Sequence, residues 1–173
     1  VRLRPVTSCS VFMIGNWNGA VRKALRSPSA PVTYGLIALC CLVFVIGPAS
    51  GLDPAYGTGD GLMAAQRAYF RRWGVVPVEL FTGSARAVLT PATALFVHGS
   101  WVHLLGNMLF LYVFGNNVED RLGRVHYLLF YVLAGAASTY AFAWANPASN
   151  GPLVGASGAI AAVLGAYVYL FPQ

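Results

Sequence analysis

The sequence predicts an all-α, polytopic membrane protein built as a helical bundle. Hydrophobic residues make up 57% of the 173 residues, charged residues make up 9%, and the mean hydropathy is +0.63. A soluble domain averages about 25% charged residues, so this chain has too little polar surface to remain in water. Four stretches without Lys, Arg, Asp or Glu approach the roughly 20 residues that cross a bilayer: 31–48, 101–118, 126–144 and 153–171.

Residues 1–30 are predicted to form a cytoplasmic arm. Every Lys and Arg that precedes the first apolar stretch lies in this arm: Arg2, Arg4, Arg22, Lys23 and Arg26. Positive residues beside a membrane span stay in the cytoplasm, which predicts a multi-pass protein of the cell membrane with its N-terminus inside. Membrane topology thus explains the net charge of +6, and no nucleic-acid partner is expected.

The first apolar stretch, 31–48, is predicted to be a retained helix. A cleaved signal peptide is the alternative, because a basic leader precedes the stretch and Ala49-Ser50-Gly51 follows it, although thirty residues make a long leader. Cys40 and Cys41 are interpreted as small buried apolar residues. Cys9 has no partner at metal-ligand spacing, so neither a disulfide framework nor a metal site is expected.

The segment 49–96 is long but hardly polar. Its aromatic and aliphatic residues are interrupted by Gly and Pro: Tyr56, Tyr69, Phe70, Trp73, Val75, Val76, Val78, Leu80 and Phe81. Aromatic residues favour the membrane interface, so we predict an external loop that lies partly in the outer leaflet. A short helix is expected from about Leu62 to Arg72, and an ordinary extracytoplasmic loop is the alternative.

The last two apolar stretches are rich in small residues at spacings of three and four. Examples are Gly135 and Ser138 in 126–144, and Gly158 and Ala162 in 153–171. Small residues let helices approach closely in lipid. The stretch 153–171 is therefore predicted to be a central helix surrounded by protein.

Four polar residues are expected to converge at one depth of this bundle. His103 and Asn107 are four residues apart in the first two turns of their stretch, so they share a helix face. His98 lies just before that helix and could turn back toward the same face. Ser157 lies near the start of the fourth stretch, which runs inward from the same outer side. Polar groups at membrane depth are costly and indicate function.

Ser157 is the candidate nucleophile. A serine hydroxyl attacks only weakly until a base takes its proton, and the oxyanion that forms needs donors such as Asn, His or backbone N–H groups. Gly155 and Gly158 permit close backbone approach and unusual dihedral angles. The pattern is not the G-x-S-x-G elbow, because Ala159 stands where the second glycine would be. His126 lies at the other membrane face and is interpreted as a structural polar residue.

These residues resemble the active-site motifs of the rhomboid intramembrane serine proteases. The run from Phe96 to Met108, FVHGSWVHLLGNM, resembles their second transmembrane helix. Gly155-Ala156-Ser157-Gly158 resembles the nucleophile motif on their fourth helix, and the EDRLG segment that starts at Glu119 resembles the chain after helix two. The resemblance extends over 31–173 and implies a partial rhomboid membrane domain.

Carried over by position, the resemblance implies a serine-type endopeptidase that cleaves transmembrane segments of other membrane proteins without metal or cofactor. Ser157 would be the nucleophile. Asn107 and His103 would stabilise the oxyanion together with the Ser157 N–H, and His98 would support the site. The implied partners are transmembrane protein substrates and membrane lipid.

The chain departs from the family pattern at the general base. In rhomboid proteases this base is a histidine on the sixth transmembrane helix, and no histidine follows Ser157 here. We therefore expect four of the usual six core helices, in a sequence that is incomplete at its C-terminal end and begins with Val1 rather than Met. Use of His103 as a substitute base is the alternative, although the resemblance gives it another role.

Two other functions stay open at this point. A rhomboid-like protein that binds transmembrane clients without cutting them would lack the base. A transporter or channel fragment would use the same polar residues to line a water-filled path. The latter gives no reason for a serine with glycine on both sides.

Overall fold

The computed structural model describes residues 30–172 apart from residue 83, and the regular elements in this part of the chain are helices. The predicted arm, 1–30, lies outside the described residues except for its last residue, and so does Cys9. The helices are α2 (Pro31–Ile46), α3 (Asp60–Trp73), α4 (Pro77–Leu80), α5 (Ala85–Thr93), α6 (Trp101–Phe110), α7 (Asn116–Leu122), α8 (Arg124–Ala145) and α9 (Ser157–Leu170). The prediction of an all-α protein is confirmed.

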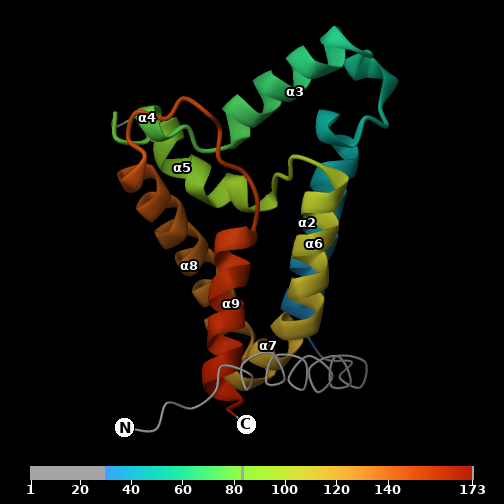
Figure 1. The fold of residues 1–173 in the computed structure, drawn as a ribbon. Coiled ribbons are helices and arrows are strands. Elements are labelled where there is room, and N and C mark those ends of the chain that lie inside the picture. The colour runs from blue at the N-terminus through green and yellow to red at the C-terminus, as the bar shows by residue number, and fades with distance from the viewer. Residues whose placement is uncertain (1–29, 83, 173) are drawn as a thin grey trace, which may run out of the picture.

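The long helices lie side by side, and the short ones gather at their ends (Figure 1). α8 packs along α9, and α2 contacts both α6 and α8. α3, α4 and α5 lie at one end of the long helices, and α7 lies at the other (Figure 1). The core between the helices is filled by large side chains, among them Phe44, Leu111, Tyr127, Tyr131 and Val163. Burial of a large apolar side chain contributes about 1.5–3 kcal/mol of stability.

Helix length bears on the predicted membrane spans. Among the described helices, α8, with 22 residues, is the one that is long and apolar enough by itself to cross a membrane. Two neighbouring helical segments, Arg86–Phe96 and Trp101–Leu122, are bent by 79° relative to each other. They would supply a second span if together they crossed the membrane once. α2 and α9 are apolar but shorter, with 16 and 14 residues. The four spans remain a prediction.

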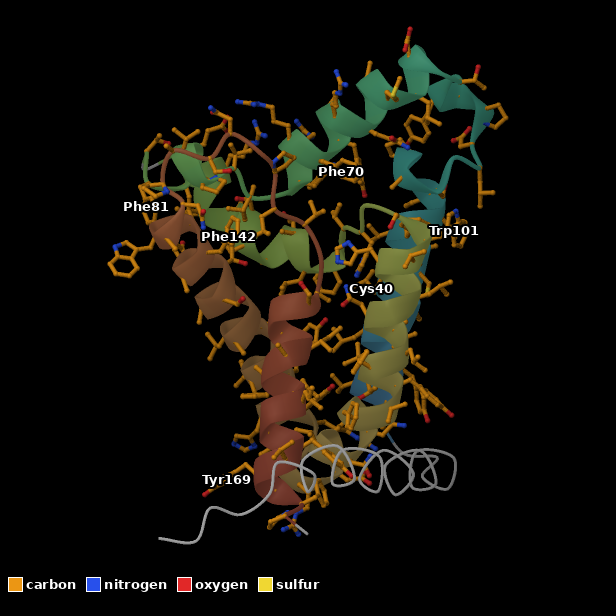
Figure 2. All side chains as sticks on the ribbon, in the orientation of Figure 1. Cys40, Phe70, Phe81, Trp101, Phe142 and Tyr169 are labelled. Atoms are coloured by element: carbon orange, nitrogen blue, oxygen red, sulfur yellow. The ribbon has the colours of Figure 1, made fainter. Side chains whose placement is uncertain are left out.

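Large apolar side chains cover the outside of the long helices. Tyr169 of α9 is 84% exposed, Val102 of α6 is 83% exposed and Trp144 of α8 is 81% exposed. Figure 2 shows Tyr169 projecting away from the bundle near the end of α9. Exposed apolar surface of this extent marks contact with lipid or with another protein.

Two helix ends differ from the sequence prediction. α2 ends at Ile46, because Gly47 is extended and Pro48 begins a short 3₁₀ turn. α9 begins at Ser157 rather than at Leu153, because Leu153 forms an isolated antiparallel bridge with Val75. The chain then passes through Gly155 with φ +115°, a conformation that essentially only glycine adopts.

The segment 49–96 contains more helix than the sequence indicated. α3 confirms the short helix expected from about Leu62 to Arg72, but α4 and α5 were not predicted. Pro77 starts α4, and the Ser84 hydroxyl caps α5 by accepting a hydrogen bond from the Ala87 N–H. Both are ordinary start signals for a helix, which the frequent Gly and Pro residues of this segment concealed.

Glu119 of α7 fastens the far end of the bundle. Its side chain is only 2% exposed and accepts hydrogen bonds from the Val32 N–H at 3.1 Å and from the Thr33 N–H and hydroxyl at 2.8 Å each. The first N–H groups of a helix have no partner within the helix, and a carboxylate suits the positive end of the helix dipole. Glu119 therefore caps α2 from a distant part of the chain.

The segment before α9 is fastened to the opposite end of the bundle. Leu153 and Val75 exchange two backbone hydrogen bonds of 2.7 and 2.9 Å, and the Gly155 N–H donates to the Ala94 carbonyl at 2.9 Å. Ala94 belongs to a 3₁₀ turn that directly follows α5. These bonds place the start of α9 beside the end of α5.

Candidate active site

Ser157 is the first residue of α9, in agreement with its predicted place near the start of the fourth apolar stretch. Its side chain is exposed and lines a pocket of about 280 Å³ between α8 and α9. The first N–H groups of a helix lack partners within the helix, and this end carries partial positive charge. An oxyanion that forms beside Ser157 would therefore meet N–H donors and a favourable dipole.

Gly155 brings the Ser157 segment against α6. A Cβ atom at Gly155 would lie 2.6 Å from Cε1 and Nε2 of His103 and 3.7 Å from Nδ2 of Asn107. Real Cβ atoms essentially never approach another atom within 3.0 Å, so no larger residue fits without displacing the His103 ring. The structure thus packs His103 against the chain two residues before Ser157, with Asn107 nearby on the same face of α6, and the helix spacing predicted that shared face.

His103 and Asn107 offer hydrogen-bond donors at this point. Ser100 caps α6 by accepting a hydrogen bond from the His103 N–H at 3.2 Å, which sets the start of the helix. Asn107 is buried, and its Nδ2 group has no hydrogen-bond partner among the described residues. An unsatisfied buried donor costs about 1–3 kcal/mol, so its retention beside Gly155 points to a ligand or reacting group.

His98 lies behind His103. It is fully buried, its Nδ1 lies 3.3 Å from the Phe96 carbonyl, and its Nε2 has no partner within the described part of the chain. The rings of His98 and His103 meet edge to face with centroids 5.2 Å apart. Burial, and the neighbouring His103, lower the pKa of His98 from 6.5 to about 4, so the imidazole is neutral at physiological pH.

Gly158 lets α8 and α9 touch just below Ser157. A Cβ atom at Gly158 would lie 2.6 Å from Cβ of Ser138 and even closer to its hydroxyl oxygen. The Ser138 and Thr139 side chains line the same pocket as Ser157, and the Thr139 hydroxyl donates to the Gly135 carbonyl at 2.9 Å. The sequence predicts Ser138 only as a small packing residue and gives Thr139 no role, although two adjacent hydroxyls in an apolar stretch are a visible signal of a polar site.

The described residues leave the base for Ser157 unassigned. No side-chain hydrogen bond found in this part of the chain involves the Ser157 hydroxyl. His126 lies in the first turn of α8, beside α7 and at the opposite end from Ser157, as expected for a residue outside the site (Figure 1). Nor are three His, Cys, Asp or Glu side chains grouped to hold a metal ion within the residues that are described.

Comparison with known proteins settles the family. Residues 85–173, more than half of the chain, match the family model described as the rhomboid domain. The chain belongs to the rhomboid family. This confirms the resemblance found in the sequence motifs and makes the protein membrane-associated, as its composition predicted. No solved structure matches the chain significantly.

The curated relatives are rhomboid-like proteins of organelles. Presenilin-associated rhomboid-like protein A, mitochondrial, from Danio rerio is 29% identical over 134 residues, which cover 72% of this chain and 35% of that protein. Rhomboid-like protein 11, chloroplastic, from Arabidopsis thaliana is 40% identical over 68 residues, covering 39% and 24%. Rhomboid protein 1, mitochondrial, from Saccharomyces cerevisiae is 38% identical over 82 residues, covering 45% and 24%. The chain therefore spans about a third or less of each relative.

Proposed function

We propose that this protein is an intramembrane serine endopeptidase that hydrolyses peptide bonds in transmembrane segments of other membrane proteins. The observation that carries the proposal is the close packing of the His103 ring at Gly155, two residues before Ser157, with the Asn107 side chain nearby. Two parts of the chain that are far apart in sequence approach each other here: α6 carries the hydrogen-bond donors, and the start of α9 carries the Ser157 hydroxyl and a helix N-terminus. Membership of the rhomboid family supports the same function.

In the proposed reaction the Ser157 oxygen attacks the substrate carbonyl carbon while a base takes the hydroxyl proton. The carbonyl oxygen becomes an oxyanion, which accepts hydrogen bonds from the Ser157 N–H and from the side chains of His103 and Asn107. Collapse of this intermediate breaks the peptide C–N bond, and the protonated base gives its proton to the leaving amine. Water then attacks the Ser157 ester by the same route and releases the acid product.

The base is the part of this mechanism that rests most on the family. We propose that it is the histidine that rhomboid proteases carry on a later transmembrane helix. His103 is the competing candidate, because its ring lies beside the chain that leads to Ser157. The two assignments differ in what His103→Gln does, since glutamine keeps a hydrogen-bond donor but cannot take up a proton at neutral pH. An oxyanion role predicts reduced labelling of Ser157 by a fluorophosphonate, whereas a base role predicts its complete loss.

In the proposed orientation the N-terminus lies in the cytoplasm. The Ser157 site then lies in the outer leaflet of the cell membrane. Ser157 lies at the same end of the bundle as α3, α4 and α5, so water would reach the site from that side (Figure 1). A transmembrane substrate would unfold locally to present an extended peptide bond, because backbone inside a helix is not accessible to a nucleophile.

A second candidate is a rhomboid-like protein that binds transmembrane clients without cutting them. It is favoured by the lack, in the described residues, of any side chain hydrogen-bonded to the Ser157 hydroxyl. The client-binding function gives no reason for the unpaired Asn107 donor near Gly155. In the proposed protease this donor stabilises the oxyanion.

The test is cleavage of a transmembrane reporter by the whole protein reconstituted in lipid. Ser157→Ala is expected to abolish cleavage, while Ser149→Ala, which removes a hydroxyl outside the pocket, leaves it unchanged. Both variants should accumulate and unfold like the natural protein. Cleavage retained by Ser157→Ala would refute the protease. Absence of cleavage in the natural protein, together with capture of the intact reporter, would favour the client-binding alternative.

A further inference from the structure

A second pocket lies outside the active site. It has a volume of about 350 Å³ and is enclosed by the end of α2, by α3 and by the chain from Thr93 to Val97. We call it the lateral pocket. Its lining is mainly apolar and aromatic: Leu39, Val43, Ile46, Tyr69, Trp73 and Phe96. Small-molecule sites in proteins occupy about 300–1,000 Å³, so the lateral pocket is large enough to hold part of a ligand.

The lateral pocket opens toward the surroundings of α2. Leu39 and Ile46 line it and are still 42% and 61% exposed on the outside of this apolar helix. In a membrane-associated protein such a face contacts lipid. The opposite wall is held in place, because Tyr69 of α3 packs against Gly47 and the Gln66 side chain donates to the Pro48 carbonyl at 3.1 Å.

Positive charge lies next to this apolar pocket. Trp73 and Thr93 also form the wall of a smaller neighbouring pocket of about 190 Å³, which Arg72 and Arg86 line. The Arg72 guanidinium lies over the Trp73 ring, 5.3 Å from its centroid. Arg86 donates one hydrogen bond to the Arg71 carbonyl at 2.6 Å, and a guanidinium has five N–H groups in all.

Two acidic side chains of this region have other partners. Glu79 forms its ion pair with Arg71, and it lines a further pocket together with Arg71 and Arg86. Asp53 uses its carboxylate to cap a 3₁₀ turn by accepting from the Ala55 N–H. An anionic group at the pocket wall would thus meet Arg72 and Arg86 at an apolar, low-dielectric boundary, where such contacts are stronger than in water.

We propose that the lateral pocket binds an acyl chain of an anionic phospholipid whose phosphate is held by Arg72 and Arg86. An anionic phospholipid joins an apolar chain to a negatively charged phosphate, and the apolar pocket and the arginine-lined pocket adjoin in the same way, because they share Trp73 and Thr93. Tyr and Trp at the membrane interface, with Arg beside them, are the usual protein partners of headgroups. A purely apolar transmembrane segment would fill the apolar part but would bring no negative charge to the arginines.

The test measures retained lipid and does not involve Ser157. The whole protein in mild detergent is incubated with phosphatidylglycerol or with phosphatidylcholine of the same acyl chains, and bound lipid is counted by native mass spectrometry. We expect about tenfold more phosphatidylglycerol than phosphatidylcholine, which corresponds to about 1.4 kcal/mol. The double variant Arg72→Gln, Arg86→Gln should lower phosphatidylglycerol to the level of phosphatidylcholine, and Val43→Trp should remove both.

Matched variants on the same helices serve as controls. Arg67→Gln changes an exposed arginine of α3 that lines neither pocket, and Leu42→Trp enlarges an exposed residue of α2 outside the pocket. Both should retain lipid like the natural protein, and thermal unfolding checks that every variant is folded. Equal retention of the two lipids, or an equal loss in Arg67→Gln, would overturn the proposal. A dimer in light scattering that Val43→Trp dissociates would overturn it too, by assigning the pocket to contact between copies.

Discussion

Gly155→Ala tests the geometry of the candidate site with the smallest possible change. The added methyl group would lie 2.6 Å from Cε1 and Nε2 of His103, so the ring must move by roughly 1 Å to reach ordinary contact. A displacement of about 1 Å at a catalytic group costs about 100-fold in rate. The backbone adds its own penalty, because φ +115° is strained for alanine by about 1–3 kcal/mol.

We therefore expect Gly155→Ala to cleave a transmembrane reporter about 100-fold more slowly in the whole protein. The melting temperature should fall by about 3–10 °C, since 1 kcal/mol corresponds to a few degrees in a chain of this size. Gly61→Ala is the control, because no atom lies within 4 Å of its Cβ position on α3. Full activity in Gly155→Ala would show that His103 and Asn107 do not need their observed contact with this segment.

Two further predictions concern buried polar residues. Glu119→Ala leaves the Val32 and Thr33 N–H groups without their acceptor. The free energy of unfolding, measured by thermal unfolding, should fall by about 3 kcal/mol. Glu119→Gln keeps an acceptor oxygen and should lower the free energy of unfolding by less. His98 has a folded-state pKa of about 4 against the ordinary 6.5, so acid favours the unfolded chain, which takes up the proton first. The free energy of unfolding should fall by about 2 kcal/mol between pH 7 and pH 5, and His98→Gln should lack this part of the fall; an unchanged acid response in the variant would contradict the assignment to His98.

The convergence of the site could be predicted from the sequence because it depends on helix periodicity. His103 and Asn107 are four residues apart, so any helix over that stretch presents them on one face. The glycines around Ser157 indicated a close approach of backbone, and the structure places the Gly155 backbone against His103. α3, Asp60–Trp73, also agrees with the short helix predicted from about Leu62 to Arg72.

Other features depended on contacts that a sequence does not display. The start of α9 at Ser157 follows from the bridge between Leu153 and Val75, two segments almost eighty residues apart. The part that Ser138 plays in the Ser157 pocket depends on how closely α8 and α9 pack at Gly158. The capping of α2 by Glu119 is likewise set by tertiary structure, because the sequence does not show which N–H groups a carboxylate in Glu119-Asp120-Arg121 will meet.

The measurement that tests the central claim most directly is to map the covalent adduct of a fluorophosphonate on the whole protein in lipid. The account predicts a single adduct on the peptide that contains Ser157, formed in parallel with the loss of reporter cleavage and absent from Ser157→Ala. Cleavage that continues while Ser157 is unmodified, or an adduct on another residue that stops cleavage, would contradict it.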